Sequence, residues 1–162
     1  MSSRTAMPGV VVRRPDPNRF EQEALAAMAI QRAAVRATLP GLQEPHSAAE
    51  DREWILGVFA HHSVWLACVD DVVVGIASRH DDWLDQLYVA PGYTGHGIGQ
   101  QLLDRMLAER SALQLWTFHR NHGARRFYER NGFVAVEFGD GSGNEECEAD
   151  VRYVRSLAPV ED

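Results

Sequence analysis

Three glycines at alternate positions, Gly95, Gly97 and Gly99, stand between an apolar run typical of a strand and a periodic apolar run typical of a helix. Backbone N–H groups at the start of a helix lack intrahelical acceptors and lie at the positive end of the helix dipole. Glycine lets a ligand approach that backbone and adopts turn conformations that other residues resist. The segment Gly95 to Gln100 is therefore predicted to bind phosphate, although a strand-to-helix turn without a ligand remains the alternative for the glycines alone.

Two common phosphate-binding motifs do not fit this segment. The dinucleotide fingerprint requires a third glycine where the sequence has Gln100. The ATP-type phosphate loop requires a lysine, and all sixteen basic residues of this chain are arginines. The same composition excludes lysine Schiff-base chemistry.

The elements around the glycines alternate in a way that predicts one mixed sheet with helices on its faces. Two capping signals, Asn18 with Glu21 and Ser47 with Glu50, predict the starts of the first two helices. Asn121 is expected to cap a later helix that ends at Asn131-Gly132. The predicted strands are Val10 to Val12, Val64 to Val69, Val72 to Ala77, Trp83 to Val89, Leu113 to Phe118, Phe133 to Phe138 and Val151 to about Arg155.

Composition narrows the function classes. A length of 162 residues suits one domain, and a net charge of −7 disfavours nucleic acid as a partner. The two cysteines, Cys68 and Cys147, have no metal-knuckle spacing, so no metal is expected. No apolar run reaches the length of a spanning helix and no secretory signal is recognised, so we expect a cytoplasmic protein that does not bind membranes.

Two segments carry a family resemblance: Leu87-Tyr88-Val89-Ala90-Pro91-Gly92-Tyr93-Thr94-Gly95-His96-Gly97-Ile98-Gly99, and Asn121-x-x-Ala124-x-x-Phe127-Tyr128 followed by Gly132-Phe133. Together they resemble the GCN5-related N-acetyltransferase (GNAT) family, and the resemblance covers nearly the whole chain. It implies a single domain over residues 1–162. The implied fold is α/β: a central mixed, mostly antiparallel sheet of about seven strands, splayed at the fourth and fifth strands and flanked by about four helices.

The resemblance implies acetyl-coenzyme A as cosubstrate, with its pyrophosphate on the glycine segment and its pantetheine beside a sheet that splays after Val89. Thr94 departs from the family pattern, which usually has arginine or glutamine there. Asn121 is expected to contact the cofactor, with a plain helix cap as the alternative. The implied cofactor-binding residues are Leu87, Tyr88, Val89, Thr94, Gly95, His96, Gly97, Ile98, Gly99, Gln100, Asn121 and Tyr128.

Acetyl transfer from a thioester to an amine requires a base, an oxyanion donor and an acid for the thiolate. By resemblance, a backbone amide near Val89 is the oxyanion donor and Tyr128 is the acid. The alternative for Tyr128 is a purely structural role as a packed aromatic ring. Asp85, on the strand that enters the site, is the proposed base. Asp82, His119 and Glu137 are its rivals, and water alone is a further alternative.

The sequence thus predicts an N-acetyltransferase that moves an acetyl group directly to a primary amine of a small molecule or peptide. The alternative is a non-catalytic domain that binds or senses acyl-coenzyme A. The acceptor pocket is expected in two variable loops, Pro40 to His46 and Gly139 to Asp150, the second of which is acidic and suits a cationic amine. A homodimer is left open.

Overall fold

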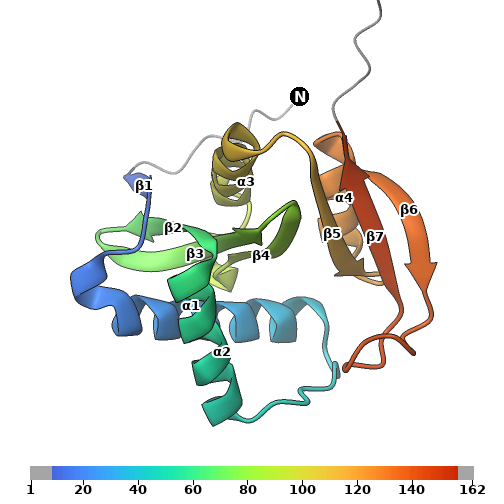
Figure 1. The fold of residues 1–162 in the computed structure, drawn as a ribbon, viewed down its shortest axis with the longest axis horizontal. Coiled ribbons are helices and arrows are strands. Elements are labelled where there is room, and N and C mark those ends of the chain that lie inside the picture. Colours follow the sequence, from blue (N-terminus) through green and yellow to red (C-terminus); the bar gives the residue numbers. More distant parts are fainter. Residues whose placement is uncertain (1–8, 157–162) are drawn as a thin grey trace, which may run out of the picture.

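The computed structural model describes residues 9–156, which form one seven-stranded sheet with helices on both faces (Figure 1). Two short 3₁₀ helices, η1 (Pro17–Arg19) and η2 (Pro91–Tyr93), lie among the longer elements. The elements are β1 (Val10–Arg13), α1 (Phe20–Thr38), α2 (Ala48–His61), β2 (Ser63–Val69), β3 (Val72–His80), β4 (Trp83–Val89), α3 (Ile98–Glu109), β5 (Leu113–Phe118), α4 (His122–Arg130), β6 (Val134–Gly139) and β7 (Asp150–Arg155).

The strand order is β1-β2-β3-β4-β5-β7-β6, and every neighbouring pair is antiparallel except β4 with β5. The parallel pair has a single register partner, Trp83 with Gln114, so these two strands separate almost at once. This confirms the predicted fold class and its splay at the fourth and fifth strands. The splay begins at Trp83, and the expectation that it starts after Val89 is wrong.

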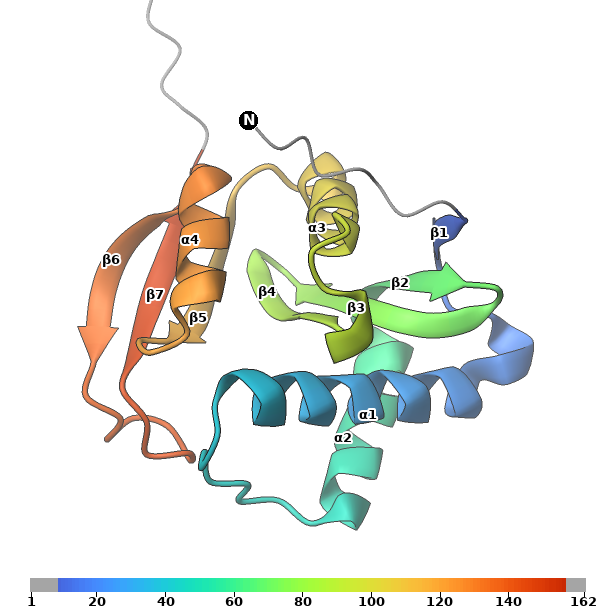
Figure 2. The ribbon, with the colours of Figure 1, turned by 180° about the vertical axis from the view of Figure 1, so that it is seen from behind.

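The sheet divides the core into two apolar clusters. Helices α1 and α2 cover one face of β2 and β3, and α3 covers the opposite face (Figures 1 and 2). Side chains alternate between faces along a strand, so Leu66 of β2 packs toward α1 while Ala67 packs with α3. The α3 cluster continues under α4 and the C-terminal strands, where Tyr153 is completely buried. Among residues 9–156, no helix has the length and apolarity needed to cross a bilayer.

The start of α1 differs from the sequence expectation. Asn18 and Glu21 form no capping box: Asp16 instead caps η1 by accepting a bond from the Asn18 amide at 2.9 Å, and α1 begins after Arg19 without a side-chain cap. Proline at the first position of η1 shifts the turn forward, because it fits a helix start and lacks an N–H. The second signal is confirmed, since Ser47 and Glu50 form the complete capping box of α2.

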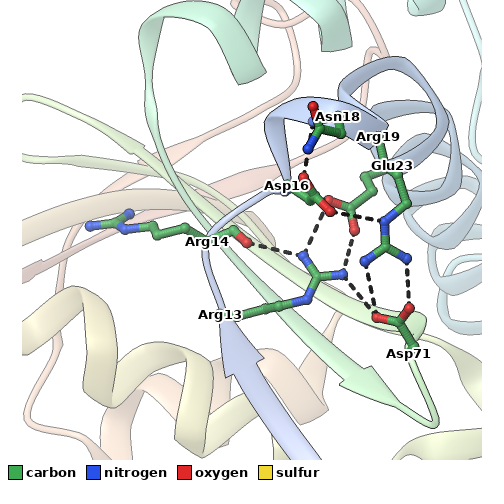
Figure 3. Close-up of polar contacts among 7 residues, drawn as sticks. All are labelled: Arg13, Arg14, Asp16, Asn18, Arg19, Glu23 and Asp71. Carbon is green, nitrogen blue, oxygen red and sulfur yellow. Dashed lines mark hydrogen bonds and ion pairs between the residues drawn. The ribbon is translucent and has the colours of Figure 1, made fainter.

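A polar network joins β1 to α1 and to the β2–β3 turn (Figure 3). Arg13 donates to the buried carboxylate of Glu23 at 2.5 Å and lies 3.5 Å from Asp71, which also accepts from Arg19 at 2.7 Å. Burial alone would raise the pKa of Glu23, but the bonds from Arg13 and from the Asp16 amide outweigh it and lower the pKa. The network therefore keeps a buried carboxylate ionised and fixes the N-terminal strand to the first helix.

The β2–β3 connection is the predicted tight hairpin. Asp70 and Asp71 both adopt left-handed conformations, with φ of 50° and 61°. Aspartate tolerates this region better than most residues do, which explains how the turn forms without glycine.

Candidate functional site

A cavity of about 600 Å³ lies where β4 and β5 separate. This volume is in the range of small-molecule sites, and loss of strand pairing gives the cavity its space. Its walls come from the end of α1, from β4 and β5, from α4 and from the β6–β7 loop. The lining residues are Val35, Thr38, Leu39, Leu84, Asp85, Leu87, Tyr88, Leu115, Trp116, Thr117, Phe118, Asn121, Ala124, Tyr128, Glu137, Gly139, Asp140, Ser142, Gly143, Asn144, Glu146 and Asp150.

Asp85 reaches this cavity through an irregularity in β4. Ser78 of β3 pairs with Gln86, and the next residue, Arg79, pairs with Leu84, so Asp85 has no partner in the register. An extra residue of this kind is a β-bulge, which bends the strand and redirects a side chain. The bulge explains why Asp85 joins Leu84 in lining the cavity while Gln86 is buried.

The carboxylate of Asp85 is partly shielded, with 26% of its side chain exposed. Burial raises the pKa of Asp85, while a hydrogen bond from His80 and the nearby His62 ring act in the opposite direction. A carboxyl group at the wall of a cavity with a raised pKa is a candidate proton acceptor.

Tyr128 lines the same cavity from α4. Its ring is 92% buried against Phe127, Phe133 and Tyr153. Tyr128 therefore has the structural packing role that was the alternative to an acid, and this role does not exclude proton donation. Burial, with a smaller effect from Tyr88, raises the pKa of Tyr128 and keeps its phenol protonated at neutral pH. The structure thus brings the predicted acid and the predicted base to one cavity.

Tyr88 is the second phenol of the cavity. Burial raises the pKa of Tyr88 to about 12, and the negative charge of Glu146 acts in the same direction. The sequence resemblance marked Tyr88 only as a cofactor contact. That Tyr88 and Tyr128 line one cavity depends on how β4 and α4 are placed in the fold, which no local pattern indicates.

The glycine segment forms the turn into α3. Gly95 and Gly97 have φ of 80° and 78°, and a Cβ at either position would meet no heavy atom within 4 Å. The first helical bond runs from the Gln101 N–H to the Gly97 carbonyl at 3.1 Å, so the amides before Gln101 have no intrahelical acceptor. No acidic residue occupies the first turn of α3. The open space and free donors fit a phosphate group.

The predicted cofactor residues fall into two groups. Leu87, Tyr88, Asn121 and Tyr128 line the cavity, whereas Val89, Thr94 and the segment Gly95 to Gln100 do not. The second group lies at the end of β4 and the start of α3. Thr94 donates to the Pro91 carbonyl at 3.2 Å. Asn121 caps α4 by accepting from the Ala124 amide at 3.2 Å and also lines the cavity, so both of its expected roles are compatible.

The β6–β7 loop, residues 140–149, forms the acidic wall of the cavity. Asp140 and Glu146 line it, together with Asp150 at the start of β7 and Glu137 of β6. The loop in which the acceptor pocket is expected thus lines the cavity, and its contact with an acceptor stays a prediction. The other expected loop, Pro40 to His46, contributes no residue to this lining, and the end of α1 takes that place.

The rivals of Asp85 have other partners. Asp82 accepts from Gln114 at 2.9 Å outside the cavity lining, and Glu137 accepts from Arg152 at 2.9 Å at the cavity wall. The His119 ring lies 6.3 Å from that of Phe138 and outside the lining. Of these four residues, Asp85 is therefore the candidate base that combines a cavity position with a pKa raised by burial.

Known proteins resemble this chain in sequence and in fold. Residues 60–135 match the model of the acetyltransferase (GNAT) domain. The uncharacterized N-acetyltransferase YafP of Escherichia coli K12 is 35% identical over 78 residues, which cover 48% of this chain and 50% of YafP. The chain spans 47% to 66% of the lengths of the curated relatives that it matches.

Solved structures extend the similarity to almost the full chain. A GCN5-related N-acetyltransferase of Rhodopseudomonas palustris superposes with a TM-score of 0.75 and 25% identity, covering 96% of this chain and 100% of that one. The PaiA N-acetyltransferase of Thermoplasma acidophilum, solved with coenzyme A, has a TM-score of 0.62 at 17% identity and covers 88% of this chain and 97% of its own. Residues 60–135 are thus identified as an acetyltransferase (GNAT) domain, and the sheet with its splayed pair has the fold of the GCN5-related N-acetyltransferases.

Proposed function

We propose that this domain transfers the acetyl group of acetyl-coenzyme A directly to a primary amine of a small molecule or peptide. The observation that carries the proposal is one cavity, opened by the separation of β4 and β5, that contains both a shielded carboxylate and a protonated phenol. The matching acetyltransferase domain supports the same activity.

The residues at the start of α3 fit the diphosphate of the cosubstrate. Free amides at the positive end of a helix bind anions, and Gly95 and Gly97 leave space for a close approach to the backbone. Bound acetyl-coenzyme A would supply an acetyl group activated as a thioester. The unpaired edge of β4, which includes Leu87, would accept an extended chain in place of the missing strand partner.

Three cavity residues have a proposed task. Asp85 accepts one proton from the substrate ammonium, so that the neutral amine can attack the thioester carbonyl, and the acidic wall around Glu146 favours entry of a cationic amine. The second proton leaves the nitrogen when the thiolate departs and returns through water to Tyr128, which has given its own proton to sulfur. Tyr128 donates its phenol proton to the departing sulfur, for which a group that stays protonated at neutral pH is suited. Direct transfer needs no covalent enzyme intermediate, and Cys68 is buried with a pKa that burial raises, so it is a poor nucleophile.

The test combines acetyl-coenzyme A binding with release of free thiol in the presence of amino acids, polyamines, aminoglycosides and peptides with free N-termini. Acceptor-dependent thiol release with an acetylated product in the mass spectrum would support the proposal. Tight binding of acetyl-coenzyme A without turnover on any amine would favour the acyl-coenzyme A sensing alternative. Absence of binding would contradict both.

A further inference from the structure

Two histidines and one aspartate from three elements meet beside the cavity. His62 follows the last residue of α2, His80 ends β3, and Asp85 occupies the bulge of β4. One nitrogen or oxygen of each lies within 4.8 Å of those of the other two. The His80 Nδ1 is hydrogen bonded to the Asp85 Oδ2, and the His62 Nδ1 lies 3.8 Å from the same oxygen.

The polar atoms of this cluster are not fully satisfied by one another. His62 Nδ1 is buried and has no hydrogen-bond partner within residues 9–156. The two imidazole rings stack with centroids 4.9 Å apart and 24° between their planes, so both Nδ1 atoms face a single carboxylate. If the His62 Nδ1 carries a lone pair, that lone pair faces an anionic oxygen, which is unfavourable without a cation between them.

The donor set selects a particular class of cation. Imidazole nitrogen with carboxylate oxygen suits Zn²⁺ and neighbouring transition metals, whereas Mg²⁺ and Ca²⁺ prefer oxygen alone. Around tetrahedral zinc, donor atoms lie about 3.3 Å apart, given Zn–N and Zn–O bonds of about 2.0–2.2 Å. The 3.8 Å separation of His62 and Asp85 requires only a small side-chain rotation to reach this geometry.

We propose that His62, His80 and Asp85 bind a Zn²⁺ ion, with a fourth position left for water or another ligand. The side chains are 27%, 44% and 26% exposed, so an ion has an entry path and the fourth position reaches solvent. Three protein ligands with one open position are the arrangement of zinc sites that exchange a ligand. The sequence expectation of no metal does not anticipate this cluster, because its members come from separate elements.

Metal binding would connect this site to the cavity through Asp85, which belongs to both. A carboxylate that coordinates Zn²⁺ has a lone pair committed to the metal and is a weaker proton acceptor. Binding of the ion and proton acceptance by Asp85 therefore compete. Zinc binding does not depend on acetyl transfer, so the site is tested by binding and stability measurements alone.

The experiment uses the full chain after treatment with a chelator and its removal. Isothermal titration with Zn²⁺ should show one ion per chain, and Zn²⁺ should raise the thermal unfolding midpoint as any ligand of the native state does. Mg²⁺ should do neither. His80→Ala and Asp85→Asn should each weaken Zn²⁺ binding by at least about tenfold, since loss of even a supporting residue of a metal site typically costs 10–100-fold.

Matched controls separate this site from general binding by surface histidines. His61→Ala removes the neighbouring exposed histidine, and His46→Ala removes a histidine that contacts Glu50 and Glu145 elsewhere. Both should retain the affinity of the parent. Circular dichroism of each metal-free variant checks the fold, and the near-isosteric Asp85→Asn keeps the test valid if His80→Ala unfolds. Equal Zn²⁺ affinity in the parent and in a folded Asp85→Asn, or equal losses in the controls, would overturn the proposal.

Discussion

The turn into α3 and the β6–β7 loop are built in opposite ways. The turn presents backbone: Gly95 and Gly97 are left-handed, carry no side chain and precede amides without intrahelical acceptors. The loop presents side chains: Asp140 and Glu146 line the cavity while other residues of the loop fix it to distant elements. Glu148 accepts from Arg120 at 2.8 Å, for example.

This difference separates a general task from a specific one. Backbone amides at a helix start bind the same diphosphate whatever side chains surround them. A wall of side chains on a loop fixes the charge and shape of one acceptor and can vary without loss of the fold. Asp85 and Tyr128 lie in the cavity bounded by the loop, and the two proton transfers of the reaction are expected to depend on them.

The largest expected effect comes from Tyr128→Phe. Turnover should fall by about 10²–10⁴-fold, because the variant loses a proton donor, while the affinity for acetyl-coenzyme A stays unchanged. The phenyl ring preserves the contacts with Phe133 and Tyr153, so the fold should be retained. Steady-state kinetics with a confirmed acceptor and direct binding of acetyl-coenzyme A measure the two properties. Parental turnover in this variant would restore a purely structural role for Tyr128.

Asp85→Asn should lower turnover by roughly 10²-fold in chelator-treated protein, because an amide cannot accept the ammonium proton. Acetyl-coenzyme A affinity should again be unchanged. Glu137→Gln serves as the matched control, since Glu137 also lines the cavity but pairs with Arg152. Equal rates for Asp85→Asn and the parent would remove Asp85 from the mechanism and favour water as the proton acceptor.

Gly97→Val should weaken acetyl-coenzyme A binding by about 10–100-fold, because the side chain would occupy the open approach to the amides and disturb one or two charge-assisted bonds. The positive φ of Gly97 also strains a β-branched residue. Gly97→Ala is therefore measured in parallel, with calorimetry for affinity and thermal unfolding for stability. Unchanged affinity in a folded Gly97→Val would show that the diphosphate lies elsewhere.

Glu146→Gln should raise KM for a cationic acceptor by about 1.5–5-fold, the size of one partly solvated charge interaction, and leave KM for acetyl-coenzyme A unchanged. The effect should shrink at high ionic strength. Glu21→Gln, which removes a carboxylate that pairs with Arg52 outside the cavity lining, is the control. A change in KM for acetyl-coenzyme A instead would mean that the turn into α3 and the β6–β7 loop are not functionally separate.

The smallest expected effect is a pH dependence of the contact between His46, in the loop from α1 to α2, and Glu145, in the β6–β7 loop. Hydrogen bonds to Glu50 and Glu145 raise the pKa of His46, and the surrounding groups that line the same hollow, Asp51, Glu53 and Glu146, are also acidic. A raised pKa in the folded state means that this contact is complete below the ordinary value of about 6.5 and is lost as pH rises through the folded value.

Hydrogen exchange at residues 40–47 and 140–149, corrected for intrinsic rates, should accelerate between pH 6 and pH 8 in the parent, a range set around the ordinary histidine pKa of about 6.5. His46→Gln should exchange fast throughout this range. The same pH dependence in His46→Gln would assign the effect to another group.

The sequence by itself determined most of the elements, the glycine turn into α3 and the resemblance to the family. Strand and helix periods, the Ser47 capping box and the glycine spacing are local, so they can be seen without knowing the fold. The error at Asn18 arose because two capping signals overlap there: Asn18 with Glu21, and Asp16 followed by proline. The proline at the first position of η1 favoured Asp16 as the cap. Tyr128 could be selected as a site residue because the family motif that contains it, from Asn121 to Phe133, is also one continuous segment.

Only the tertiary structure decided what surrounds these residues. The bulge that turns Asp85 toward the cavity is a property of the β3–β4 register, and the convergence of His62 and His80 on Asp85 depends on how α2, β3 and β4 meet. The splay at Trp83 likewise depends on β5 diverging from β4. Contacts of this kind join residues far apart in the chain, and no local periodicity encodes the distance between them.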